Sequence, residues 1–133
     1  MAEGWIISPG FPFSYENNMD CVWDVRAPEG HVVVLTVVNL DLEDPNNCPY
    51  DWLGVAYTNT MQQEIKMCQP QNIGRIITSR SNFMRIFFHS DVIVTRRGFN
   101  VTLSAQGINF ILHDILLTIH NFLQLVTLLR NCV

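Results

Sequence analysis

The chain has 133 residues, of which 48% are hydrophobic, and a formal net charge of −4. This length and apolar content predict one globular domain with a hydrophobic core, and they exclude a disordered or collagen-like chain. A nucleic-acid-binding protein would show a basic face, whereas this chain has a net negative charge, so no nucleic-acid partner is expected.

Residues 4 to about 106 show the pattern of short β-strands separated by turns. Residues 21–25 alternate between apolar and polar side chains, and residues 31–40 are rich in valine, which indicates a central strand or one buried on both faces. Further strands are expected near 51–58, 75–78, 84–89 and 99–103. Several short strands with turn signals between them predict an all-β sandwich or barrel.

From residue 107 onward the composition changes. Residues 108–133 carry only two formal charges, are rich in Leu and Ile, and contain no Gly or Pro. They predict a separate hydrophobic, helical tail over 107–133. Its length suffices for a membrane span, but His113, Asp114 and other polar residues make insertion costly. Two readings stay open, namely membrane association through 108–133 and an amphipathic segment that packs on the domain or on itself.

The cysteines and one sequon indicate the compartment. Cysteines at 21, 48, 68 and 132 lack zinc-type spacing, and their even number is compatible with disulfides in an oxidising compartment. Asn100-Val101-Thr102 is a glycosylation sequon on the expected solvent face of its strand. Both features predict a secreted protein or an ectodomain. The first residues lack the basic start and apolar stretch of a signal peptide, so none is expected there.

Acidic residues gather in the segment 41–55, between two predicted strands. Asp41, Glu43 and Asp44 precede Cys48, and Asp51 follows it. Carboxylates crowded into one turn repel one another unless a cation lies among them. That cation is either a metal ion or a lysine of a partner.

Catalysis is not expected. Neighbouring residues of a strand point to opposite faces, so His89, Ser90 and Asp91 cannot form a hydrolytic relay, and the sequence has neither GxSxG nor HExxH. Arg96-Arg97 is interpreted as a solvated pair in a loop, with contact to an anion or a glycan as the alternative.

Several segments occur in the order found in CUB domains, the extracellular β-sandwich modules of complement and tolloid-type proteases and cubilin. The resemblance covers residues 4 to about 105. It rests on GWIISPGFP (4–12), YENN (15–18) with Cys21 and Trp23, VRAPEG (25–30), Leu42-Glu43, CPYD (48–51), Met67-Cys68, FHSD (88–91) and Gly98-Phe99.

The resemblance implies a fold and a site. The fold is an antiparallel, jelly-roll-like β-sandwich with a disulfide between Cys48 and Cys68. In many CUB domains, acids at the positions of Glu43, Asp51 and Asp91 bind Ca²⁺, a hard cation that prefers oxygen ligands. Two further residues are expected to support that site, Tyr15 by orienting a carboxylate and Ser90 by completing or supporting the shell.

In the family this calcium end often binds a basic side chain of a protein ligand. The resemblance therefore implies a noncatalytic, calcium-dependent recognition module whose partner presents a Lys. The alternative is a structural or accessory module of a larger secreted protease or endocytic receptor, without activity of its own.

The chain departs from the family pattern at both ends. Neither the family's first edge strand nor the cysteine that pairs with the one at position 21 occurs before Gly4, so the sandwich is expected to lack that strand. Cys132 is one possible partner of Cys21, and a free or intermolecular thiol is the other. The tail over 107–133 has no counterpart in the family pattern.

Overall fold

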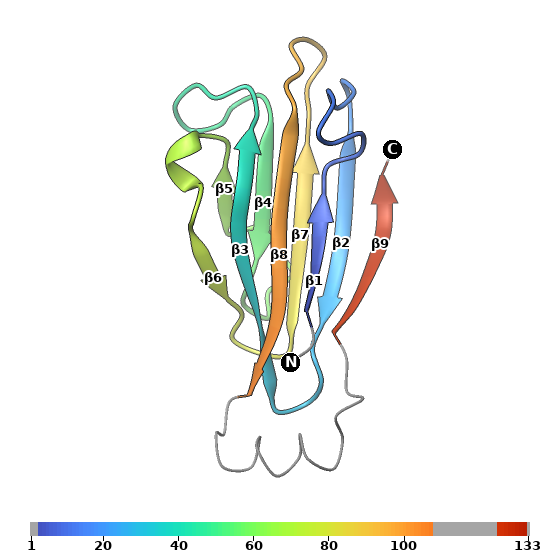
Figure 1. The fold of residues 1–133 in the computed structure, drawn as a ribbon, viewed down its shortest axis with the longest axis vertical. Helices are drawn as coiled ribbons and strands as arrows, with labels where there is room; N and C mark the ends of the chain where they lie inside the picture. Colours follow the sequence, from blue (N-terminus) through green and yellow to red (C-terminus); the bar gives the residue numbers. More distant parts are fainter. Residues whose placement is uncertain (1–2, 108–124, 133) are drawn as a thin grey trace.

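The structure is a computed structural model that describes residues 3–107 and 125–132. Two antiparallel sheets face each other, one with strand order β1-β8-β3-β6 and one with order β5-β4-β7-β2-β9 (Figure 1). The all-β sandwich is thereby confirmed. The elements are β1 (Glu3–Ile7), β2 (Asp20–Arg26), β3 (His31–Asp41), β4 (Trp52–Ala56), β5 (Ile65–Met67), the 3₁₀ turn η1 (Pro70–Asn72), β6 (Ile76–Thr78), β7 (Phe83–His89), β8 (Gly98–Gly107) and β9 (Val126–Cys132).

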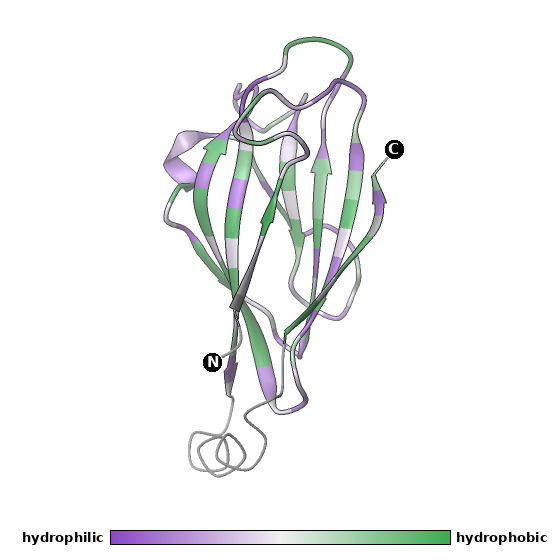
Figure 2. Cartoon of the chain, turned by 45° about the vertical axis from the view of Figure 1, so that its right-hand side comes forward, coloured by the Kyte–Doolittle hydropathy of each residue, from purple (hydrophilic) through white to green (hydrophobic). Residues whose placement is uncertain are grey.

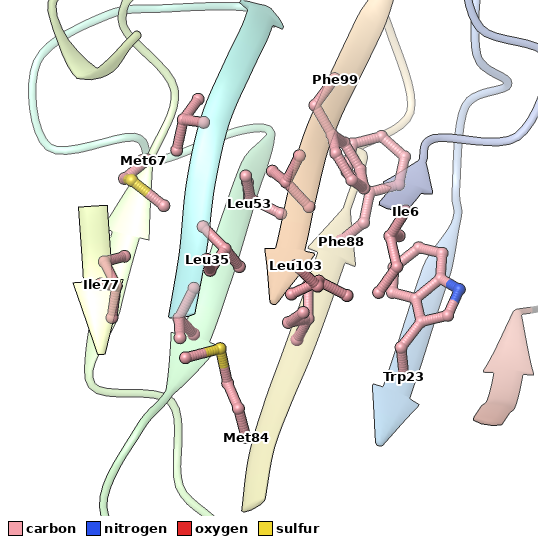
Figure 3. Close-up of a cluster of buried hydrophobic side chains, with 14 of the residues drawn as sticks. Ile6, Trp23, Leu35, Leu53, Met67, Ile77, Met84, Phe88, Phe99 and Leu103 are labelled. Carbon is pink, nitrogen blue, oxygen red and sulfur yellow. The ribbon is translucent and has the colours of Figure 1, made fainter. Parts of the chain in front are cut away.

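Side-chain alternation along each strand builds the core between the sheets. In β2 the side chains of Cys21, Trp23 and Val25 are buried while those between them are partly exposed. Strand β3 repeats this pattern with odd-numbered residues inward as far as Val37, and a register shift between Val37 and Asn39 then turns Leu40 inward. The inward residues of both sheets interlock in one cluster, and Trp23 and Phe88 each meet Phe99 there (Figure 3). This continuous core fixes the position of each sheet relative to the other.

Three loops meet at one end of the sandwich, and they connect β1 to β2, β3 to β4, and β7 to β8 (Figure 1). The β1–β2 loop begins against the start of β8, where the N–H of Phe99 donates to Ser8 Oγ at 3.0 Å. A Cβ at Gly98 would lie 1.8 Å from that same oxygen, and Gly98 has φ +103°. Glycine is therefore required for this close approach, which anchors the loop.

The predicted helical tail is wrong for its C-terminal part. Residues Val126–Cys132 form strand β9, which pairs antiparallel with β2 and lies at the edge of the five-stranded sheet. A disulfide joins Cys132 to Cys21, so the edge beside β2 is occupied and Cys21 is not a free thiol. An apolar segment without Gly or Pro suits a strand as well as a helix, and here the unpaired backbone of β2 and the disulfide favour the strand.

The remainder of the predicted tail, residues 108–124, lies outside the described residues. Membrane association through this segment therefore stays a prediction. Among the described residues, no helix is long and apolar enough to span a membrane.

A second disulfide joins Cys48 to Cys68, the pairing that the resemblance implies. It connects the β3–β4 loop to the end of β5.

Candidate metal centre

Main-chain hydrogen bonds hold the β7–β8 loop against the β1–β2 loop. The N–H of Asn18 donates to the carbonyl of Asp91 at 2.8 Å, and the N–H of Tyr15 donates to the carbonyl of Arg96 at 3.2 Å. Ser90 reinforces this contact, because its Oγ accepts from the N–H of Met19 at 2.9 Å and donates to the carbonyl of Glu16 at 2.7 Å. Ser90 therefore joins the loops rather than contacting the carboxylates.

Asp51 lies at the centre of the site and is fully buried at the start of β4. Its Oδ2 accepts from the Tyr15 hydroxyl at 2.5 Å, and its Oδ1 accepts from the N–H of Asp91 at 2.8 Å. Burial raises the pKa of Asp51, while these two hydrogen bonds lower it. Burial also raises the pKa of Tyr15, so the phenol stays protonated and donates.

Glu43 comes from the β3–β4 loop, held in place by the buried side chain of Leu42. Its Oε1 is buried and has no hydrogen-bond partner. One carboxylate oxygen from each of Glu43, Asp51 and Asp91 can be chosen so that all three lie within 4.8 Å of one another. Burial raises the pKa of Glu43, and the carboxylates of Asp91 and Asp51 raise it further.

This arrangement fits a hard cation. An unpartnered buried carboxylate oxygen is costly, and crowded carboxylates repel, so a cation among them would relieve both penalties. Oxygen donors without thiol or imidazole suit Ca²⁺ better than Zn²⁺. Tyr15 contacts Asp51 but supplies no carboxylate, so its hydroxyl orients a potential ligand, as second-sphere groups commonly do.

The other acids of the segment lie apart from this cluster. Asp41 Oδ2 accepts from the N–H of Arg97 at 3.3 Å, and Asp44 is exposed. The main-chain N–H of Asp91 is a contributor that sequence reasoning missed. No side-chain pattern could have identified it, because it belongs to the backbone.

Two other sequence-based expectations have a place in the fold. His89 Nδ1 lies 2.7 Å from Asp20 Oδ1 on the outer face of the five-stranded sheet. Neither residue belongs to the cluster of three carboxylates. The residues of the 89–91 triplet therefore have separate partners rather than a shared relay. Asn100 is half-buried on β8, between β1 and β3, with Thr102 exposed two residues on.

The chain is similar to known extracellular modules. It is 39% identical to pig cubilin over 102 residues, which is 76% of this chain and 3% of cubilin. The zebrafish Gpr126/Adgrg6 full extracellular region superposes with TM-score 0.74 and 30% identity, covering 81% of this chain and 14% of that one. The MASP-1 CUB2 domain bound to Ca²⁺ superposes with TM-score 0.67 and 25% identity, covering 77% of this chain and 92% of that one.

The chain thus spans a small part of the cubilin sequence and nearly all of a single-domain structure. A family model described as "CUB domain" matches residues 1–103. By this match and by its fold, the chain belongs to the CUB domain family.

Proposed function

We propose that this domain is a noncatalytic extracellular recognition module that binds Ca²⁺ through Glu43, Asp51 and Asp91. The observation that carries the proposal is the clustering of Glu43, which has a buried and unpartnered Oε1, with two further carboxylates. A calcium ion takes six to eight oxygen ligands, so main-chain carbonyls and water would complete its shell. Tyr15 and Ser90 would support the site by fixing Asp51 and the loops.

The bound ion would order the acidic loops for a protein ligand. A carboxylate that binds calcium with one oxygen still presents lone pairs outward, and these accept charge-assisted hydrogen bonds from an ammonium group. The partner is therefore expected to present a basic side chain, in particular a Lys. CUB domains generally bind protein partners, and the MASP-1 CUB2 relative is described as bound to Ca²⁺. Both facts support the proposal.

Isothermal titration with calcium tests the metal site. The wild-type domain is expected to bind one ion with a Kd of about 10⁻⁴ to 10⁻³ M, the range of extracellular calcium modules. Asp51→Asn and Asp91→Asn should each weaken binding at least about tenfold, which corresponds to one lost charged ligand. Asp44→Asn, a matched change of an exposed acid in the same segment, should leave binding intact. Absence of binding to the wild type at millimolar calcium would refute the proposal.

The basic partner is tested with a minimal probe. N-acetyl-lysine methylamide should shift amide resonances around Asp51 and Asp91 in calcium, and its norleucine analogue should not. Equal shifts from both probes, or shifts that survive chelation, would place the contact elsewhere. Calcium binding without any lysine response would favour the second candidate, a structural module of a larger secreted protease or endocytic receptor.

Asn100 is proposed as a glycosylation site of the secreted protein.

A further inference from the structure

Three consecutive aliphatic side chains lie exposed at the tip of the β7–β8 loop, directly after Asp91. We name Val92, Ile93 and Val94 the apolar tip, and their exposed fractions are 65%, 66% and 43%. Figure 1 shows this loop as the furthest extension of the site end of the sandwich, and Figure 2 shows hydrophobic colouring along it. Exposed aliphatic residues in a row on a protruding loop differ from the scattered single ones found on any surface.

The apolar tip is joined to the acidic cluster. The N–H of Ile93 donates to Asp91 Oδ1 at 3.3 Å, so a potential metal ligand also binds the backbone of the tip. Val94 has φ 59°, a left-handed conformation that disfavours β-branched residues. The chain thus places an aliphatic side chain where glycine or asparagine would be less costly. An exposed aromatic side chain lies on the neighbouring loop, because Phe13, 78% exposed, follows Pro12, whose carbonyl accepts from Arg97 Nε at 3.2 Å at the base of the β7–β8 loop.

Two basic residues follow the apolar tip at its base. Arg96 and Arg97 are exposed, and neither guanidinium is within ion-pair distance of a carboxylate among the residues that the structure describes. Arg97 uses its Nε for the Pro12 carbonyl and keeps its terminal nitrogens for other partners. The charge of Arg96 lowers the pKa of Glu43, so this arginine acts on the acidic cluster without an ion-pair contact. Exposed guanidinium groups bind phosphate well, because their planar N–H groups match its oxygens.

We propose that the apolar tip inserts into the surface of a membrane that contains anionic phospholipid, while Arg96 and Arg97 bind lipid phosphate groups. Aliphatic side chains would enter the acyl boundary, and Phe13 would lie at headgroup level. The acids Glu43, Asp51 and Asp91 would repel this surface in the absence of a cation. The calcium dependence of docking, and only that part, rests on the proposed function.

The observations favour lipid over protein as the occupant of the apolar tip. A protruding aliphatic tip requires a matching cavity in a protein partner, whereas fluid hydrocarbon adapts to any shape. The tip, Phe13 and the two arginines also combine apolar and phosphate-binding groups in the order in which a lipid leaflet presents acyl chains and headgroups. A lysine-bearing ligand at the acids has no charge complementarity with Arg96 and Arg97.

Vesicle sedimentation tests the proposal. Vesicles of phosphatidylcholine with phosphatidylserine should bind the wild-type domain in millimolar calcium, and vesicles of phosphatidylcholine alone should bind it more weakly. Ile93→Ser should reduce binding about tenfold, as expected for one buried aliphatic side chain. Ile76→Ser is the matched control, because Ile76 is 64% exposed on β6, the edge strand of the four-stranded sheet, and its substitution should leave binding unchanged. Arg96→Gln with Arg97→Gln should abolish the preference for the anionic vesicles.

The result that overturns the proposal is absence of vesicle binding by a wild-type domain that binds calcium in titration, or equal binding by the Ile93→Ser and wild-type domains. Loss of a protein contact in Ile93→Ser without any vesicle binding would also overturn it and assign the tip to protein. If titration shows no calcium binding, the proposed metal site fails instead. In that case, vesicle binding that persists in chelator and is weakened by Ile93→Ser would support membrane insertion of the apolar tip without a role for the metal site.

Discussion

Replacing Glu43 by Gln should raise the stability of the calcium-free domain and remove its response to calcium. The substitution keeps the shape of the side chain and deletes one charge. In the calcium-free state it also ends the repulsion that acts on a carboxylate with a buried, unpartnered oxygen. In the calcium-bound state it deletes a ligand. The two states should therefore respond in opposite directions.

The magnitudes follow from the geometry. Two unit charges no more than 4.8 Å apart repel by at least about 1 kcal/mol in water and by at least about 3 kcal/mol at an effective dielectric constant of about 20. After screening, Glu43→Gln should raise the free energy of unfolding of the calcium-free domain by about 1–3 kcal/mol. In about 10 mM calcium, a site with a Kd of about 10⁻⁴ to 10⁻³ M stabilises the wild type by about 1.4–2.7 kcal/mol.

Thermal unfolding in chelator and in calcium measures both effects. The wild type should gain about 5–10 °C in Tm on adding calcium, and Glu43→Gln should begin higher and gain little. Asp44→Asn, which changes an exposed acid one residue away, should behave like the wild type in both conditions. A variant that is less stable than the wild type in chelator, or that keeps the full calcium shift, would refute the reasoning.

Three further predictions concern the support of the site and of the sheet. Tyr15→Phe leaves Asp51 Oδ2 without its donor, so urea unfolding should show a loss of about 1–3 kcal/mol and titration a weaker calcium affinity; unchanged values would contradict the orienting role. Cys132→Ser opens a loop of sequence separation 111 and Cys68→Ser one of 20, so chain entropy predicts losses of about 5 and about 3 kcal/mol, and a reversed order in urea unfolding would oppose this account. Burial raises the pKa of Glu43 and Asp51, so the folded calcium-free domain binds protons more tightly than the unfolded chain, and its stability should fall as pH rises from about 4 towards neutrality. In Glu43→Gln this fall should be smaller, and an equal fall in urea titrations across pH would argue against the burial of that carboxyl.

The strands of the sandwich were predictable because their signal is local. Alternation in residues 21–25 and the valine run after His31 depend only on neighbouring side chains. The structure buries the predicted face of β2. It makes β3 a central strand between β8 and β6, with the other face only partly buried. The resemblance to CUB domains added what local patterns cannot supply, namely which distant acids would meet. The structure brings Glu43, Asp51 and Asp91 together, while their role as calcium ligands stays a prediction.

Strand β9 was missed because its signal is not local. Val126–Cys132 pairs with β2, more than a hundred residues earlier, and an apolar segment carries no information about so distant an edge. The burial of Glu43 Oε1 could not be predicted from the sequence for a similar reason, because it depends on how the loops pack rather than on the residue itself. The exposed tip after Asp91 also depends on how far that loop extends from the sandwich.

A crystal structure determined in millimolar calcium tests the central claim most directly. We expect one ion bound by oxygens of Glu43, Asp51 and Asp91 at about 2.3–2.6 Å, the distances typical of calcium, with the Tyr15 hydroxyl still donating to Asp51. Glu43 Oε1 should then be a ligand or a hydrogen-bond acceptor rather than an unpartnered atom. An ion bound elsewhere, or an acidic cluster that stays without an ion at saturating calcium, would contradict the account.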